Sequence, residues 1–193
     1  MQKTVVWKPW NNPGVENLRL TLDDMGVHAT GQLMQSLEGQ SIVASYGLNY
    51  DPRWRFRNLW LKADNQGQRS LQLQRDIRGT WFHNGEPRTD LNDCQTVMLS
   101  ASPFTHTALL QRSALESGQS VEQQVAYVDL MTFQVQARVQ RYRHLGRHEG
   151  GIRYNSEAEG TPSNALTVDE HALVRACNQY QRISARTLTP AFA

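Results

Sequence analysis

Hydrophobic and polar residues alternate with a period of two along most of this chain, and this pattern constrains the fold more than any other feature. Successive side chains of a β-strand point to opposite faces, so each alternating run predicts a strand with one buried and one exposed face. The clearest runs are 18–22, 27–33, 42–50, 71–77 and 133–139. One apolar face per strand is typical of an antiparallel sheet. We therefore expect a mainly β protein.

Residues that favour turns separate these runs. Asn-Gly is a strong signal for a two-residue hairpin, and Asp-rich segments turn the chain in a similar way. The predicted hairpin turns are 23–26, 64–67, 84–85 and 169–170, and the predicted loops are 150–151 and 157–163. Ten or more strands joined in this way make a sheet so large that it must roll, close or fold over itself to bury its apolar face.

One segment, 103–115, is predicted to be a short helix that plugs or flanks the sheet. Ser102 is suited to cap its start, Pro103 to occupy its first helical position and Gly118 to end it. The polar run 102–107 at its start could hold an anion, because helix N-termini favour negative charge. An ordinary capping role explains the same residues equally well.

Length and charge narrow the class of protein. The 193 residues suit one domain, 1–193, whose last residues, 187–193, have no pattern and are expected to be loose. The formal charge is only +2, from 20 basic and 18 acidic residues, so we expect no nucleic acid as a partner. The apolar run at the start is too short for a signal peptide, and no run approaches the ~20 apolar residues of a membrane span. We therefore expect a cytoplasmic protein.

Motifs for catalysis and for metal binding are scarce. The chain has no G-x-S-x-G elbow, P-loop or G-x-G-x-x-G, and we expect no cofactor. His144 and His148 have a metal-like spacing of four, but they lie among arginines, so we expect a solvated loop rather than a metal site. The run 169–171, Asp-Glu-His, could be an acid/base cluster but is more simply a polar turn. Cys94 and Cys177 are expected to be reduced, buried thiols, with a single bridge as the alternative.

The segment 53–61 interleaves aromatic residues with arginines. As one strand, it would place Trp54, Phe56 and Trp60 on one face and Arg53, Arg55 and Arg57 on the other. Three arginines on one face could bind an anion, and the aromatic residues could stack on bases. The alternative is an aromatic core face backed by a solvated basic face. A second basic run, 138–148, is expected to be a charged strand end.

Several blocks across the chain resemble a bacterial family whose members are described only as putative glycolipid-binding proteins. Trp10 followed by 14–18 resembles the opening Trp and G-[LV]-E-x-L run of that family. The segment 48–57 resembles its Y-x-x-D-x-x-W-x-x-R block. The shorter matches are 79–81 to G-x-W, 91–94 to L-x-G-C and 102–107 to T-P-F-T-N-T.

The chain also departs from the family pattern. Thr96, Met98 and Leu99 stand where the family has acidic residues in a D-x-D-L pattern. His106 replaces an asparagine, and 108–113 keeps only the second arginine of L-P-I-R-R-L. If those acidic and basic residues form a polar site in the family, that site is altered here.

The resemblance implies a single large antiparallel sheet rolled into a spiral β-roll or half-open barrel with one short helix. It implies non-catalytic binding of a lipid-like or glycolipid-like amphiphile in a cavity of the rolled sheet, and it leaves the oligomeric state open. Aromatic side chains would contact acyl chain or sugar, and Arg57 and Arg112 would meet anionic oxygens. The ligand-binding residues that it implies are Trp10, Trp54, Arg57, Trp81, Phe104, Thr105 and Arg112.

Two alternative functions remain open at this stage. One is an enzyme that acts on a lipid-like or sugar-like substrate, with Asp51, Asp93 or His106 as acid/base groups. The other is a module that binds protein, or weakly binds RNA, through the arginines of 53–57 and 141–143.

Overall fold

One continuous sheet, rolled but not closed, forms the framework of the protein. The computed structural model describes residues 1–37, 39–64 and 67–188. Within these residues fifteen strands form one sheet in the order β8-β7-β6-β5-β4-β3-β2-β1-β15-β14-β13-β12-β11-β10-β9. The strands at the two ends of this order, β8 and β9, do not pair with each other, so the roll stays open. The predicted mainly β class, with one rolled sheet, is confirmed.

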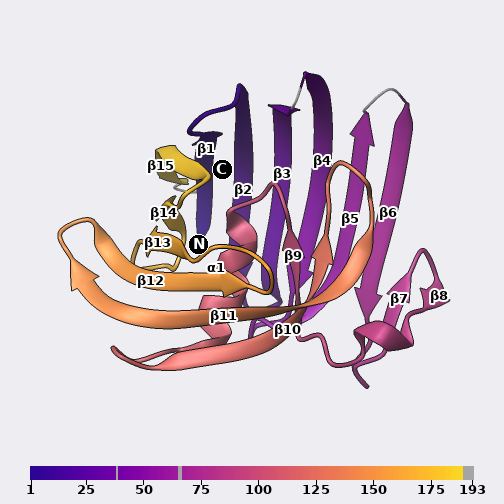
Figure 1. Cartoon of the computed structure of the whole chain (residues 1–193). Helices are drawn as coiled ribbons and strands as arrows, with labels where there is room; N and C mark the ends of the chain where they lie inside the picture. Colours follow the sequence, from indigo (N-terminus) through magenta and orange to yellow (C-terminus); the bar gives the residue numbers. More distant parts are fainter. Residues whose placement is uncertain (38, 65–66, 189–193) are drawn as a thin grey trace, which may run out of the picture.

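The two halves of the chain supply two parts of the roll, joined by the antiparallel pair of β1 and β15. The first part consists of β1 (Gln2–Pro9), β2 (Gly14–Asp23), β3 (Gly26–Leu37), β4 (Gln40–Tyr50), β5 (Phe56–Asp64), β6 (Gln68–Arg75), β7 (Trp81–His83) and β8 (Glu86–Pro87). After a short 3-10 helix, η1 (Thr89–Leu91), the second part consists of β9 (Thr96–Leu99), β10 (Ser120–Val128), β11 (Val135–His148), β12 (Gly151–Ala158), β13 (Asn164–Val168), β14 (Val174–Ala176) and β15 (Tyr180–Leu188). The helix α1 (Phe104–Ser113) lies between β9 and β10 in sequence. Figure 1 shows β10, β11 and β12 running across the layer of β1 to β6, with α1 between the two layers.

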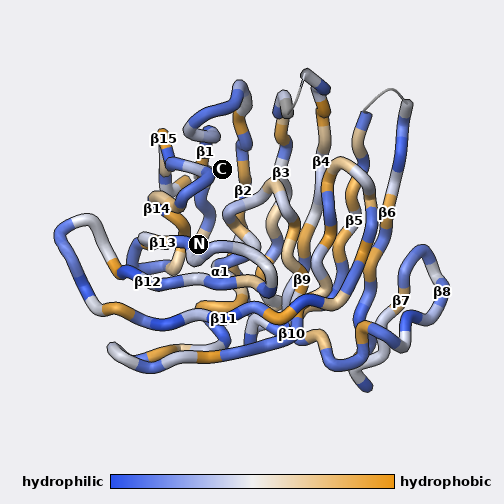
Figure 2. Tube along the Cα trace, viewed as in Figure 1, coloured by the Kyte–Doolittle hydropathy of each residue, from blue (hydrophilic) through white to orange (hydrophobic). Residues whose placement is uncertain are grey.

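The alternation in the sequence becomes the core on the inner face of the roll. The side chains of Val27, Ala29 and Leu33 on β3 and of Ile42 and Leu48 on β4 are at most 2% exposed. Figure 2 shows hydrophobic and hydrophilic residues alternating along these strands. The core continues through β9 and the start of α1, so the inner face of the sheet packs against the second part of the chain.

A glycine in β3 lets a tyrosine of β4 lie across the inner face. Gly31 pairs with Tyr46, and a Cβ atom at Gly31 would lie 2.2 Å from the Tyr46 ring. The ring is fully buried, and its hydroxyl contacts Glu16 and Ser102. The glycine therefore makes room for a polar contact between β2, β4 and the start of α1.

The segment 53–61 is not one strand, and this prediction is wrong. The chain turns between Asp51 and Arg55, Trp54 has a left-handed backbone with φ 58°, and β5 begins only at Phe56. The pairing of β4 with β5 also shifts between Asn49 and Tyr50. Because the turn and the shift interrupt the period of two, the three arginines do not line one face of a strand.

The run 133–139 is also buried differently from the prediction. Phe133 has φ 62° and lies in the turn before β11, while Ala137 is exposed and Val139 is only half-buried. Gln140 and Tyr142 are buried instead. The face of β11 that packs inward changes along this long strand, which sequence alternation alone cannot show. The same strand carries His144 and His148, which were expected in a loop.

Most of the predicted turns and the helix are confirmed, with different ends. The hairpins at 23–26, 84–85 and 169–170 are present, whereas the turn predicted at 64–67 includes residues 65–66, which lie outside the described part of the chain. Ser102 does not cap α1: the cap position is Pro103, without a side-chain hydrogen bond, and Ser102 Oγ donates to Glu16 instead. The helix ends at Ala114 in the left-handed conformation, not at Gly118.

Three further predictions concern the C-terminal segment, the run 71–77 and the cysteines. Residues 187 and 188, predicted to belong to a loose tail, pair with Lys3 and Gln2 in the sheet, and the rest of that tail, 189–193, lies outside the described part of the chain. The run 71–77 ends early, because Ile77 is 88% exposed beyond the end of β6. Cys94 and Cys177 are free and buried, as expected. Within the described residues, no helix has the length and apolar character that a membrane crossing requires.

Candidate functional site

A polar cleft opens beside the start of α1, between β10 to β12 and the segment before β15. It consists of two adjoining hollows of about 380 Å³ and about 320 Å³. The two hollows share the wall residues Ser100, Tyr127, Asn178, Gln179 and Tyr180. We call this feature the polar cleft.

Hydroxyl and amide side chains dominate the polar lining of the cleft. The polar residues of its walls include Ser102, His106, Gln140, Ser156, Asn164 and Asn178 on one side and Asn11, Asn12, Gln35 and Gln179 on the other. Among the described wall residues, the charged ones are Arg138, whose guanidinium lies 3.7 Å from the centre of the Tyr127 ring, and Asp129. Uncharged donors and acceptors of this kind suit a neutral, hydroxyl-rich ligand.

Hydrogen bonds between distant strands hold these side chains in place. Gln140 Nε2 donates to Ser156 Oγ at 2.9 Å, which joins β11 to β12. Gln35 Nε2 donates to the Tyr180 hydroxyl at 2.8 Å, which joins β3 to β15. Because buried polar side chains that are paired in this way lose little freedom on binding, the walls are organised in advance.

His106, in the first turn of α1, is the half-buried imidazole of the cleft. Its Nδ1 is hydrogen-bonded to the Tyr142 hydroxyl of β11. Burial lowers the pKa of His106 to about 4, so the ring is neutral at pH 7. Because Nδ1 already contacts Tyr142, only Nε2 is left for a ligand, as a donor in one tautomer and as an acceptor in the other, and the ring offers no charge.

A buried carboxyl group lies behind the Ser102 wall. Glu16 Oε1 accepts hydrogen bonds from Ser102 Oγ at 2.6 Å and from the Tyr46 hydroxyl, whereas Glu16 Oε2 has no partner. Burial raises the pKa of Glu16 to about 7, although the hydrogen bonds from Ser102 and Tyr46 act in the opposite direction. The Ser102 hydroxyl is therefore fixed by a carboxyl group that changes its charge near neutral pH.

Of the seven residues implied by the family resemblance, Trp10 lies beside the polar cleft. Its indole Nε1 donates to the Cys177 carbonyl at 2.7 Å, and its backbone N–H donates to the Gln179 carbonyl at 3.0 Å. The side chain is 48% exposed. Trp10 therefore presents an aromatic surface next to Gln179, which lines the cleft.

Three of the seven residues lie in the core beside α1. Trp81 and Phe104 are fully buried: Trp81 stacks on Phe56 with ring centres 4.9 Å apart, and Phe104 lies 6.5 Å from the Trp54 ring. Thr105 is also buried, and its Oγ1 donates to the Ser102 carbonyl at 2.8 Å. These three side chains are part of the packed interior of the protein.

The remaining residues, Trp54, Arg57 and Arg112, lie around the 51–55 turn, where the Trp54 ring packs on Phe104 at the start of α1. Arg57 forms an ion pair with Asp51 at 3.0 Å, and Arg112, in the last turn of the helix, donates to the Gln95 carbonyl at 2.8 Å. None of the three is among the described wall residues of the polar cleft, so the residues expected to form one site are divided between two places.

Two of the three candidate acid/base residues, Asp51 and Asp93, lie outside the polar cleft. Asp51 accepts hydrogen bonds from the backbone N–H groups of Arg53 and Arg55 and from the guanidinium groups of Arg55 and Arg57. Burial raises the pKa of Asp51, but these hydrogen bonds outweigh it, and the pKa is lowered overall. Asp93 is exposed. Neither carboxyl group lines the polar cleft.

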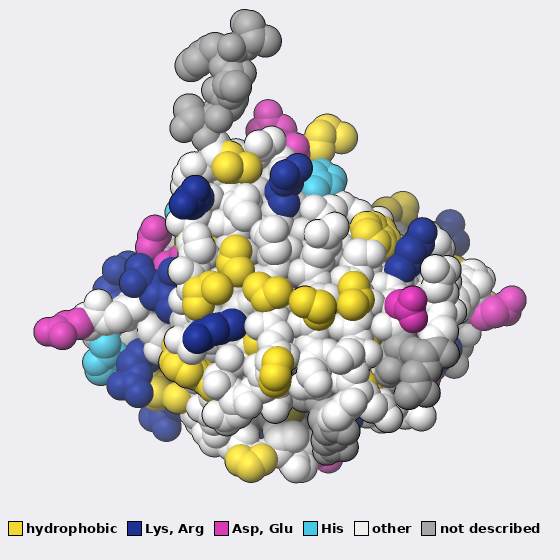
Figure 3. All heavy atoms as spheres, turned by 90° about the horizontal axis from the view of Figure 1, so that it is seen from above, with side chains coloured by type: hydrophobic (Ala, Val, Ile, Leu, Met, Phe, Trp, Pro, Cys, Tyr) yellow, Lys and Arg dark blue, Asp and Glu magenta, His cyan; other side chains and the backbone are white. Residues whose placement is uncertain are grey.

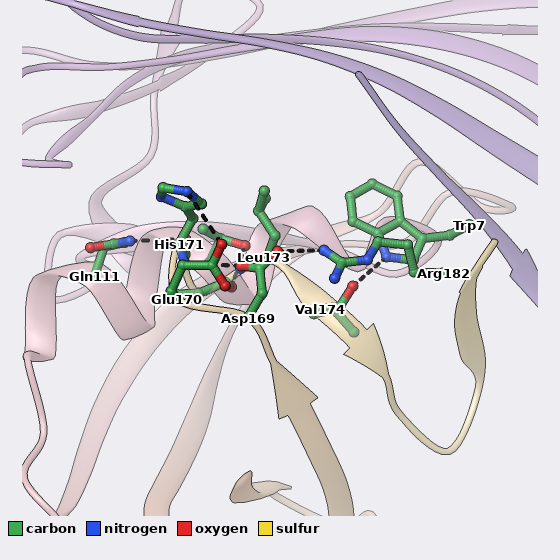
Figure 4. Close-up of polar contacts among 10 residues, drawn as sticks. Trp7, Gln111, Asp169, Glu170, His171, Leu173, Val174 and Arg182 are labelled. Atoms are coloured by element: carbon green, nitrogen blue, oxygen red, sulfur yellow. Dashed lines mark hydrogen bonds and ion pairs between the residues drawn. The ribbon is translucent and has the colours of Figure 1, made fainter. Parts of the chain in front are cut away.

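The run 169–171 is a polar turn with a structural role. Figure 4 shows Asp169 between β13 and β14, where it binds Arg182 at 2.5 Å and accepts the backbone N–H groups of His171 and Leu173. In the same region Trp7 Nε1 donates to the Val174 carbonyl at 2.8 Å. These contacts fasten the hairpin to β1 and β15.

His144 also has a structural partner rather than a metal. Its Nδ1 is 2.9 Å from the Leu115 carbonyl, and its ring stacks on Tyr154 with centres 4.7 Å apart. Among the described residues, no group of three potential metal ligands occurs.

Sequence reasoning missed several residues of the cleft, including Gln140, Ser156 and Tyr180. They belong to three different strands of the second part of the chain. Gln140 was placed on the wet face of its predicted strand but is only 6% exposed. The local sequence pattern does not show that such a polar residue is buried, because its burial depends on distant strands.

A separate hollow of about 1040 Å³ lies on the outer face of β2 to β6, and we call it the outer groove. Val15, Met34 and Val43 line it, pair directly across three strands and are 37%, 54% and 56% exposed. Figure 3 shows a row of hydrophobic side chains on one surface of the molecule. The groove therefore offers apolar surface outside the core.

Comparison with known proteins gives one family and two structural neighbours. Residues 4–186 match the family model described as "Putative glycolipid-binding". The chain is similar to the crystal structure of a DUF1089 family protein from Pseudomonas aeruginosa, with 29% identity and a TM-score of 0.72 over 83% of this chain and 88% of that one. It also shares its fold with a β-barrel-like protein of domain of unknown function DUF1849 from Brucella abortus, with 4% identity and a TM-score of 0.56 over 95% of this chain and 96% of that one. No curated protein matches.

Proposed function

Because the chain belongs to the "Putative glycolipid-binding" family, we propose that it binds a glycolipid-like amphiphile without transforming it and holds the sugar head group in the polar cleft. The observation that carries this proposal is the lining of the cleft by fixed hydroxyl and amide groups. Sugar hydroxyls both donate and accept hydrogen bonds, and such groups complement them without requiring charge on the ligand.

The size of the cleft favours a head group over an acyl chain. Its hollows of about 380 Å³ and about 320 Å³ are at the lower end of the roughly 300–1,000 Å³ typical of small-molecule pockets. A long acyl chain would therefore extend beyond the cleft.

The exposed ring of Trp10 completes the proposed site. Indole rings provide an apolar face at low conformational cost, and the ring is fixed here by its hydrogen bond to the Cys177 carbonyl. We assign Trp10 to ligand contact and Thr105, Phe104 and Trp81 to support of the walls. A carrier of this kind needs no acid/base group in the cleft.

Native mass spectrometry of the gently purified protein tests the proposal first. We expect a discrete added mass that extracts as a glycolipid, or uptake of one from a lipid extract. The variant Gln140→Ala should weaken uptake about tenfold or more, because it removes a buried hydrogen-bonding group from the wall.

The exposed Gln124 of the neighbouring strand β10 provides the matched control. Gln124→Ala should bind as the wild type does, since its side chain is exposed and is not among the residues of the cleft wall. Circular dichroism would verify that both variants fold. If Gln140→Ala folds and takes up glycolipid as well as the wild type, the head group does not bind in this cleft.

A further inference from the structure

Four arginine side chains converge where the 51–55 turn, the end of β6 and the end of α1 meet. Arg55 and Arg57 both bind the Asp51 carboxylate, at 2.6 Å and 3.0 Å. Arg75, the last residue of β6, and Arg112, in the last turn of α1, lie close enough for their charges to repel each other. We call these four residues the arginine cluster.

The cluster holds more positive than negative charge. The pKa of the Arg75 guanidinium is lowered, mainly by burial and then by the charge of Arg57. The pKa of Arg112 is lowered by burial and by the charge of Arg75. Asp51 is shared between Arg55 and Arg57, and the charge of Asp76 acts on Arg75, so two carboxylates face four guanidinium groups. Like charges that interact in a partly buried setting are destabilising, and an anion between them offsets the repulsion.

Arg75 also has an unused donor. Its Nε is buried and has no hydrogen-bond partner, and none of the ion pairs among the described residues involves Arg75. Asp76, the acidic neighbour, is already engaged, because its Oδ1 accepts the backbone N–H groups of Arg78 and Thr80. Buried donors in folded proteins nearly always have an acceptor, so an unpaired guanidinium nitrogen indicates a place for one.

The backbone around the cluster is shaped in two unusual ways. Trp54 adopts φ 58°, which few non-glycine residues do, and its ring packs between Tyr50 and Phe104 at 5.9 Å and 6.5 Å. Gly79 has φ 95°, and a Cβ atom there would lie 3.2 Å from Arg75 Nη2. The positive φ of Trp54 is a strained conformation, which is retained where the surrounding structure requires it, whereas glycine adopts a positive φ at little cost.

We propose that the arginine cluster binds a phosphate-type oxyanion, with Arg75 and Arg112 as its main ligands. Guanidinium groups match the geometry of tetrahedral oxyanions and can donate two hydrogen bonds each. The anion would offset the repulsion within the cluster and accept from the free Nε of Arg75. The oxyanion could be a soluble phosphate or the phosphodiester of an anionic lipid, since both present the same oxygens. None of the four arginines is among the described wall residues of the polar cleft, so the two sites are distinct.

Thermal unfolding in phosphate tests the site. The melting temperature of the wild type should rise in sodium phosphate above its value in sodium chloride of the same ionic strength, because general screening acts equally in both. In Arg75→Gln and in Arg112→Gln the affinity for phosphate should fall about tenfold each. Arg53→Gln is the matched control: Arg53 is an exposed residue of the same turn, and it should keep the full response.

Sedimentation with vesicles separates the two sources of the oxyanion. Retention on phosphatidylglycerol but not on phosphatidylcholine vesicles, lost in Arg75→Gln, would identify a lipid phosphodiester. A phosphate response without vesicle retention would identify a soluble anion. Equal melting temperatures in phosphate and chloride, or a phosphate response unchanged in both arginine variants, would overturn the proposal. Gln140→Ala should leave the phosphate response intact, so failure of the glycolipid proposal would not affect this result.

Discussion

Replacing Asp169 with asparagine should remove a large part of the stability of this fold. The side chains of Asp169 and Arg182 are only 6% and 12% exposed, and their ion pair spans 2.5 Å. Asparagine keeps an oxygen that can accept the backbone N–H groups of His171 and Leu173. Asp169→Asn therefore keeps the turn and removes both the negative charge and the acceptor opposite Arg182.

The expected cost follows from the burial of the pair. Removing one partner of a buried ion pair leaves the other charge uncompensated and typically costs about 3–5 kcal/mol. Domains of this kind have a free energy of unfolding of roughly 5–15 kcal/mol, so the variant should be strongly destabilised. Arg182→Met should cost a similar amount. The double variant should cost clearly less than the sum, because neither charge then remains buried alone.

Urea unfolding followed by tryptophan fluorescence measures these free energies. Trp7 donates to the Val174 carbonyl of the same hairpin, so its emission reports on this region. A loss below about 1 kcal/mol in Asp169→Asn, or costs that simply add in the double variant, would refute the assigned role of the pair.

The pH dependence provides a second measure of the same interaction. Burial raises the pKa of Asp169, but the hydrogen bonds from Arg182, His171 and Leu173 outweigh it and lower the pKa overall. The pair therefore contributes its full stability above the unfolded pKa of about 3.9 and loses it as the pH falls through the lower folded value. Asp169→Asn should lack this acid-side loss.

Two further predictions concern the inner face of β2 to β4. The pKa of Glu16 is raised from 4.5 to about 7, so the folded state holds a proton that the unfolded state releases, and stability should fall as the pH rises between these values. Glu16→Gln should abolish this dependence of stability on pH, and the variant should be about 2–3 kcal/mol more stable than the wild type at pH 8. Urea titrations at several pH values measure this, and a pH dependence that persists in the variant would belong to another group. Gly31→Ala should cost about 2–3 kcal/mol, because the buried Tyr46 ring lies 2.2 Å from the new Cβ atom and its hydroxyl is held by Glu16 and Ser102. Gly150→Ala is the control: the nearest atom would lie 3.9 Å from the new Cβ atom, so the free energy of unfolding in urea should stay close to that of the wild type.

Local patterns in the sequence predicted the elements that depend on local forces. Alternation located β3 and β4, and Asn84-Gly85 located the turn between β7 and β8. The helix was predicted within 103–115 and extends over Phe104–Ser113. Side-chain alternation, turn geometry and helical spacing depend on residues a few positions apart, so a single sequence carries them.

The errors share a physical cause. The run 53–61 has the alternation of a strand, but the Asp51 carboxylate gathers the backbone N–H groups of Arg53 and Arg55 and folds the chain into a turn. Gln140 lies at a position predicted to be wet, yet the curvature of β11 brings it to Ser156 inside the cleft. In both cases side-chain contacts outweighed the local pattern.

The sequence by itself determined that this protein is a large antiparallel sheet with one helix and an apolar inner face. That outcome follows from hydrophobic burial, which acts on every alternating strand independently of its partners. Only the tertiary structure decided where polar groups meet. The polar cleft joins residues from β3, β11, β12, β15 and α1, and the arginine cluster joins a turn, a strand end and a helix end. These sites depend on the path of the rolled sheet, because it brings together side chains that lie far apart along the chain.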